Sequence, residues 1–217
     1  MSSKIGVQNI AHTNGTVAAT VSSGGVVAFN NPPTGIVAGS RKLLLNHTIS
    51  SAVALFDVDN TYINATYDTY EFQCMFHPVT NGARVEYKFF DATSTGSAGA
   101  IPSGNNHSYS IGNWKAAGNR ASNGGTTAEV SYSTIGNLDG EALAFSMTLY
   151  NANDLRMPAS TSGIGVNSDI NGYNMGFGFS GGLVPTTTYF NHFCRGIRFE
   201  FDTGDIQLGS IKVYGVT

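Results

Sequence analysis

Histidine, cysteine and acidic side chains are the residues of this chain that could bind a metal or act in catalysis, and their spacing favours neither. The five histidines are scattered, and His192-Phe193-Cys194 lacks the paired ligand spacing of a zinc site. Asp57 and Asp59 share one side of a strand end, where two carboxylates could hold a hard cation such as calcium. More commonly such residues end a strand and form an Asx turn. The sequence therefore predicts no catalytic residue, no metal and no cofactor.

A glycine motif near residue 180 has the spacing of a dinucleotide-binding fingerprint. Gly176-Phe177-Gly178-Phe179-Ser180-Gly181 matches it, but the fingerprint needs a helix directly after the glycines to hold the pyrophosphate. The next residues, Gly182 to Pro185, lead into a threonine run rather than a helix. We interpret the segment as a glycine-rich strand or bulge.

Aromatic side chains in a loop-rich stretch are the candidates for recognition. Residues 91–127 contain many Gly, Ser and Asn, and long excursions from a β scaffold commonly carry binding sites. Tyr109 and Trp114, the only tryptophan, lie in this stretch beside Asn and Ser and are the candidates for stacking on a sugar ring. The alternative is that both rings cover the end of the fold, as amphipathic aromatics often do.

Alternating apolar and polar residues predict an all-β fold. One face is apolar in residues 70–76, 84–89, 143–149 and 197–213, and no segment shows helical spacing with good helix formers. The first two segments flank Asn81-Gly82 and predict an antiparallel hairpin, and the last range predicts a second hairpin at the C-terminal end. We expect an antiparallel, jelly-roll-like β-sandwich over residues 38–217 with an extended N-terminal arm before it.

The arm, residues 1–37, is apolar but nearly uncharged. It contains Ile5, Val7, Ile10 and Phe29 and a single charged residue, Lys4. Burial of these side chains against one another would not offset the cost of ordering the backbone, about 1–2 kcal/mol per residue. We therefore expect these four residues to order against a neighbouring subunit or partner and to act in assembly.

Low charge excludes several classes of partner. Charged residues make up 12% of the chain, the net charge is −3 and no basic run exists, so binding to nucleic acid is not expected. No apolar run approaches membrane-spanning length, and the first residues lack the apolar stretch of a signal peptide. Cys74 and Cys194 are expected to be buried and reduced. Low charge suits a protein that buries much of its surface in an assembly.

Several segments together resemble β modules of bacteriophage tail fibres and other virion proteins. They are Tyr67 to Phe72 with Asn81-Gly82 after it, Gly196 to Phe201 followed by Gly209 to Gly215, and Ser3 to Ile10. The resemblance implies a virion structural protein with a jelly-roll-like domain and supplies no catalytic residues.

What the resemblance implies about function is a short tail fibre or host-recognition module, with a capsid decoration or cement protein as the alternative. It implies a homo-oligomer, a trimer by analogy with phage fibres, whose partners are other proteins of the tail or capsid and a host-surface glycan. The expected location is the virion, assembled in the host cytoplasm. A free carbohydrate-binding module is the alternative from another class, and an enzyme is the least favoured reading.

Overall fold

The computed structural model consists of β-strands throughout the residues that it describes. Two compact units are present, Met1–Ser40 and Arg41–Thr217. No helix occurs in the described ranges, and none of them could therefore span a membrane as a helix. These ranges are 9–11, 17–21, 27–29, 41–92, 107–113, 119–154, 156–183 and 193–217.

The first unit is a small antiparallel sheet. Its three strands are β1 (Asn9–Ala11), β2 (Val17–Val21) and β3 (Val27–Phe29), in that order across the sheet. Ile10 and Phe29 both pair with Ala19, one on each side of β2. Ile5 and Val7 lie outside the described residues. A role of this unit in assembly stays a prediction.

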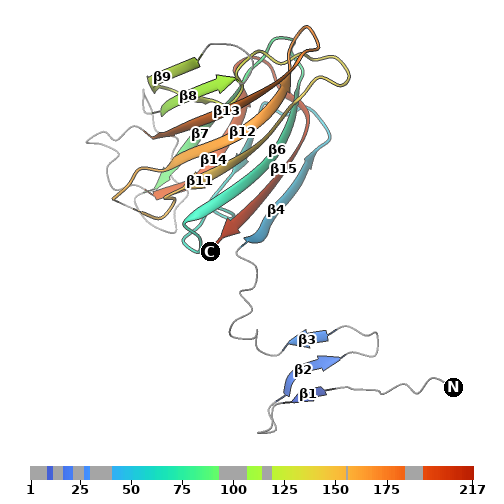
Figure 1. Cartoon of the computed structure of the whole chain (residues 1–217), viewed down its shortest axis with the longest axis vertical. Coiled ribbons are helices and arrows are strands. Elements are labelled where there is room, and N and C mark those ends of the chain that lie inside the picture. The colour runs from blue at the N-terminus through green and yellow to red at the C-terminus, as the bar shows by residue number, and fades with distance from the viewer. Residues whose placement is uncertain are drawn as a thin grey trace, which may run out of the picture. The chain divides into compact units, whose positions relative to one another are not determined.

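The second unit consists of two antiparallel sheets that pack face to face (Figure 1). The large sheet has eight strands in the order β4 (Arg41–Ile49), β15 (Ile206–Val216), β6 (Thr69–Pro78), β11 (Leu143–Tyr150), β12 (Ser160–Ser168), β13 (Asn174–Leu183), β8 (His107–Asn113) and β9 (Asn119–Gly125). The small sheet has four, in the order β10 (Ala128–Glu129), β7 (Val85–Ala92), β14 (Phe193–Phe201) and β5 (Leu55–Val58). The prediction of an all-β antiparallel sandwich is confirmed.

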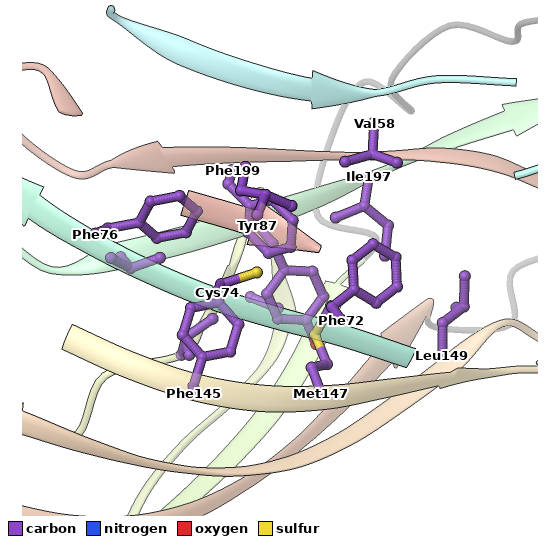
Figure 2. Close-up of a cluster of buried hydrophobic side chains, with 14 of the residues drawn as sticks. Val58, Phe72, Cys74, Phe76, Tyr87, Phe145, Met147, Leu149, Ile197 and Phe199 are labelled. Atoms are coloured by element: carbon purple, nitrogen blue, oxygen red, sulfur yellow. The ribbon is translucent and has the colours of Figure 1, made fainter. Parts of the chain in front are cut away.

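The core lies between the sheets and follows the predicted alternation. Every second residue of β6 and of β11 is buried, while the residues between them face outward. Phe199 of the small sheet lies among three rings of the large sheet, with its ring centroid 6.0 Å from Phe72, 5.7 Å from Phe76 and 5.9 Å from Phe145. Figure 2 shows this aromatic cluster, which joins the two sheets.

The two predicted hairpins are wrong, because the strands of each pair lie in different sheets. β6 pairs with β15 and β11 in the large sheet, whereas β7 pairs with β14 and β10 in the small sheet. In the second predicted hairpin, β14 lies in the small sheet and β15 in the large sheet. In a hairpin the apolar faces of both strands would lie side by side and would need a further layer to cover them. In the observed arrangement, a β-arch, the two strands lie in facing sheets, and the apolar face of each sheet is covered by the other sheet.

The two β-arches stack on each other at one end of the sandwich. The Asp202 N–H donates to the Arg84 carbonyl at 2.9 Å, and the Arg84 N–H donates to the Asp202 carboxylate at 2.8 Å. The Val79 N–H donates to the Asp205 carbonyl at 2.9 Å. Gly82 makes the turn at Asn81-Gly82 with a φ of 86°, so the sequence indicated the turn correctly but not the sheet to which the next strand belongs.

Glycines on the inner face of β12 leave room for large rings of β13. A Cβ atom on Gly163 would lie 2.4 Å from both Phe179 Cζ and the Ser146 carbonyl oxygen. One on Gly165 would lie 2.6 Å from Phe177 Cζ. The core therefore requires glycine at these two positions.

Replacement of Gly163 by alanine is expected to destabilise the protein by about 1–3 kcal/mol, because the new methyl group overpacks the core beside Phe179. Gly178→Ala is the matched control, since its Cβ would meet no atom nearer than 3.8 Å. Its free energy of unfolding should change by less than about 1 kcal/mol. Chemical denaturation measures both, and equal stability of the two variants would contradict the observed packing.

His107 is a buried histidine that the structure keeps neutral. Its ring stacks on Phe89 at 5.7 Å between centroids, and Nε2 accepts the Phe89 N–H at 3.2 Å. Burial, together with the nearby positive charge of Lys88, lowers the pKa of His107 to about 4. In the unfolded chain its pKa is about 6.5, so the unfolded state binds the proton more tightly. The contribution of neutral His107 to folding stability is therefore fully present above about pH 6.5 and is lost as the pH falls towards about 4.

Between pH 7 and pH 4 the native protein should lose up to about 3 kcal/mol more of its unfolding free energy than His107→Gln. Glutamine retains an acceptor for the Phe89 N–H but does not titrate. Urea unfolding at several pH values measures the difference. The exposed His47→Gln is the control and should lose as much unfolding free energy as the native protein. If the pH dependence of stability is weakened equally in both variants, His107 is not its cause.

Candidate binding surface

The outer face of the large sheet is built from the residues that alternate with its core positions. Strand register places them in rows that cross the sheet. One row contains Lys212, Gln73, Ser146, Ile164 and Gly178, and the next contains Ser210, Met75, Ala144, Val166 and Gly176. We call these ten residues, from β15 to β13, the outer face.

This part of the sheet carries almost no charge. The four adjacent strands β11, β12, β13 and β8 contain no Lys, Arg, Asp or Glu. Lys212 is the one charged residue of the outer face. Such a surface selects a partner by shape, apolar contact and neutral hydrogen bonds rather than by charge.

A shallow depression of about 500 Å³ lies on the outer face. Its large apolar side chains are exposed, with Met75 at 48%, Val166 at 46% and Ile164 at 58%. Around them lie the polar groups of Gln73, Ser146, Ser210 and Lys212. Exposed apolar side chains that gather over a polar-rimmed hollow mark a binding surface.

A second depression, of about 420 Å³, lies further across the same sheet and has hydroxyl-rich walls. Its lining includes Ser108, Ser110, Ser160 and Ser180, with Gly182 among them. Serine hydroxyls both donate and accept hydrogen bonds, which suits a neutral, polyhydroxylated ligand. The nearby Tyr150 is 40% exposed, and its hydroxyl lies 3.2 Å from the Ser162 hydroxyl.

The outer side of the small sheet differs, because it carries charged side chains, four of which form two ion pairs. Arg198 donates two hydrogen bonds to the Asp57 carboxylate, at 2.7 and 2.8 Å, and Lys88 forms an ion pair with Glu200. Burial raises the pKa of the neighbouring Glu86. The two ion pairs already use both basic groups within the protein.

For Asp57 and Asp59 the sequence offered a cation site or an Asx turn, and the structure shows an ion pair and an Asx turn. Asp57 is paired with Arg198, and Asp59 accepts the Thr61 N–H at 2.9 Å, which is an Asx turn. Throughout the ranges that the structure describes, no three His, Cys, Asp or Glu side chains come together to hold a metal ion. The two cysteines are buried free thiols, as predicted, and burial raises the pKa of Cys74.

The glycine motif lies inside β13, between paired residues on both sides, and is a glycine-rich strand as expected. Gly178 to Gly182 also has the Gly-x-Ser-x-Gly spacing of a nucleophile elbow. That elbow needs a sharp turn from a strand into a helix. Ser180 instead lies within the strand, so neither motif brings catalytic chemistry to the sheet.

The structure places only part of the predicted recognition site. Tyr109 lies on β8, half-buried against the core, and its hydroxyl donates to Glu129 at 2.9 Å. Trp114 lies outside the described residues. Their role in binding stays a prediction. For Ile10 and Phe29, the structure gives the backbone pairing described above.

Sequence reasoning did not identify the outer face, although a signal was present. Residues 157–168 and 170–194 contain no Lys, Arg, Asp or Glu, in contrast with the alternation of charge and apolar residues in β7 and β14. A strand with one buried face normally places charged or strongly polar residues on the other. Long uncharged strands therefore indicate a second face that avoids charge.

Comparison of the chain with protein-family models, with curated proteins and with solved structures found no match in any of the three.

The exposed residues of the outer face should contribute little to stability. Ile164→Thr keeps the β-branched shape at a 58% exposed position and should change the unfolding free energy by less than about 1 kcal/mol. Met147→Ala, at a buried position of the adjacent β11, should cost about 2–5 kcal/mol. Thermal and urea unfolding compare them. A large loss in Ile164→Thr would mean that this side chain serves the fold rather than a partner.

Proposed function

We propose that the chain is a non-enzymatic structural protein of a bacteriophage virion, acting as a short tail fibre or host-recognition module. A capsid decoration protein is the alternative within this class. The resemblance of Tyr67 to Phe72 and of Gly196 to Gly215 to virion β modules supports the class. In this proposal the protein works as a homo-oligomer bound to other virion proteins, and its location is the virion.

Strand order supports a jelly-roll assignment for the sandwich. With the inserted pairs β8–β9 and β12–β13 set aside, the large sheet reads β4-β15-β6-β11 and the small sheet reads β5-β14-β7-β10. Each sheet then begins with an early strand paired to a late one, as two interleaved Greek keys require. The inserted pairs extend only the large sheet, and they carry much of its uncharged surface.

The nearly uncharged outer face, with Lys212 as its one charge, is the observation that carries the proposal. A reaction centre needs titratable or metal-binding groups that converge on one point. The outer face and the serine-lined depression beside it instead offer a broad surface with shallow hollows, exposed apolar side chains and hydroxyl groups. Such a surface fits a protein whose task is to attach and assemble.

The hydroxyl-rich depression favours a second candidate, a carbohydrate-binding module. Ser108, Ser110, Ser160 and Ser180 supply neutral donors and acceptors, and Tyr150 supplies a half-exposed ring. A glycan array with the purified protein tests this candidate. Binding that is lost in Ser180→Val and retained in Ser210→Val would support it. An array on which the protein binds no glycan would contradict this candidate and leave assembly as the one remaining role.

Deletion of residues 1–37 should leave the sandwich folded but remove the protein from the particle. The sandwich is a compact unit with its own core, whereas the three short strands of the first unit are expected to act in docking. Far-UV circular dichroism and thermal unfolding check the fold. Immunogold electron microscopy of purified virions measures incorporation of full-length and truncated protein.

Absence of the full-length protein from virions would refute the virion assignment. Normal incorporation of the truncated protein would refute only the role of the arm. These outcomes are separable because the first concerns location and the second concerns one segment.

A further inference from the structure

The outer face is corrugated in a regular way. Ile164 and Val166 of β12 form an exposed ridge. On one side the ridge is flanked by Gly178 and Gly176 of β13, with which these two residues pair, and on the other side by the small residues of β11. Since neighbouring strands are about 4.8 Å apart, each trough is about one strand wide. A ridge of this width fits a trough of the same kind.

The fold itself does not demand the trough at Gly178. Gly163 and Gly165 on the inner side must be glycine because a Cβ would strike a ring or a carbonyl. At Gly178 a Cβ would meet nothing nearer than 3.8 Å. A glycine inside a strand weakens it, so one without an internal reason marks a close approach from outside. The missing side chain therefore indicates that something docks on this face.

Charge and area favour a second copy of the chain as the occupant. The face has one charge among ten residues, so two copies in contact would meet little repulsion. The contact would extend along the five strands beyond the ten residues, which adds Glu71, already paired with Arg41 at 2.7 Å. About eight residues of each strand span about 24 Å by 26 Å, or about 600 Å² per copy. Two copies would bury about 1,200 Å², which is above the ~1,000 Å² that a specific interface needs.

A sugar fits the depression around the ridge less well. The outward side chains there are Gln73, Met75, Ser146, Ile164 and their neighbours, none of them aromatic. Small-molecule sites usually combine aromatic walls with a few convergent polar groups. Apolar ridges, small residues and depleted charge are instead typical of contacts between subunits.

We propose that two copies of this protein pair through the outer faces of their large sheets, with the Ile164–Val166 ridge of each copy in the Gly178 trough of the other. The contact is isologous, because the same patch serves both copies. The proposal rests on the homo-oligomeric part of the proposed function and names its surface. It joins copies in pairs, so a trimer would need a different surface.

Sedimentation velocity of the full-length protein over a concentration series tests the pairing. The native chain should form a dimer. Gly178→Leu fills the trough and Ile164→Ala flattens the ridge, and each should raise the dimer dissociation constant at least tenfold. An equimolar mixture of the two variants should regain dimer, because each remaining ridge meets an open trough and each flattened ridge meets a filled one. Met157→Ala, an exposed apolar residue outside the outer face, is the control and should pair normally.

Circular dichroism and thermal unfolding establish that the variants are folded. If Gly178→Leu does not fold, Ile164→Lys replaces it, because it brings two like charges into the contact and should also abolish the dimer. A monomeric native protein, an oligomer that none of the variants alters, or a mixture that does not regain dimer would overturn the pairing. A protein found in virions without the pairing would leave the proposed function intact, and pairing without incorporation would refute the location alone.

Discussion

The stacking of two β-arches determines how the sandwich is held together. β6–β7 and β14–β15 each pass from one sheet to the other, and their strands pair with each other in both sheets. Hydrogen bonds between Arg84 and Asp202 tie the arches where the chain crosses. The sheets are thereby kept at the distance that the ring of Phe199 needs to lie among those of the large sheet. Both the buried core and the exposed outer face depend on this arrangement.

The glycines on the two sides of the large sheet have different structural roles. On the inner side, rings from β13 cover β12 so closely that Gly163 and Gly165 have no room for a side chain. On the outer side, Gly178 has that room and still has no side chain. The contrast separates glycines that serve packing from one that leaves a surface open. A composition rich in glycine thus has two physical origins within one pair of strands.

Alternation in the sequence was sufficient to predict β6, β7, β11, β14 and β15 and their buried faces, since Phe72, Tyr87 and Phe199 all face the core as expected. It did not predict β8 and β9, which lie within residues 91–127, where the sequence indicated loops. It was not sufficient to predict sheet membership. A period of two is the same in a hairpin and in an arch, and Asn81-Gly82 marks a turn in either case. The outer face was missed for a related reason: its residues come from five strands spread over much of the chain, and only the register brings them together. Trp114, one of the two candidates for recognition, lies outside the described residues.

The position of β15 has a consequence for synthesis of the protein. This strand follows all the others in the chain, yet it lies between β4 and β6 inside the large sheet. Until it leaves the ribosome, the edges of β4 and β6 that will receive it are open, and the core side chains Ile211 and Val213 are missing. Pairings between such distant segments form slowly. The sandwich can therefore close only after β15 has been made, and a prematurely terminated chain would be left with exposed strand edges that chaperones and proteases recognise.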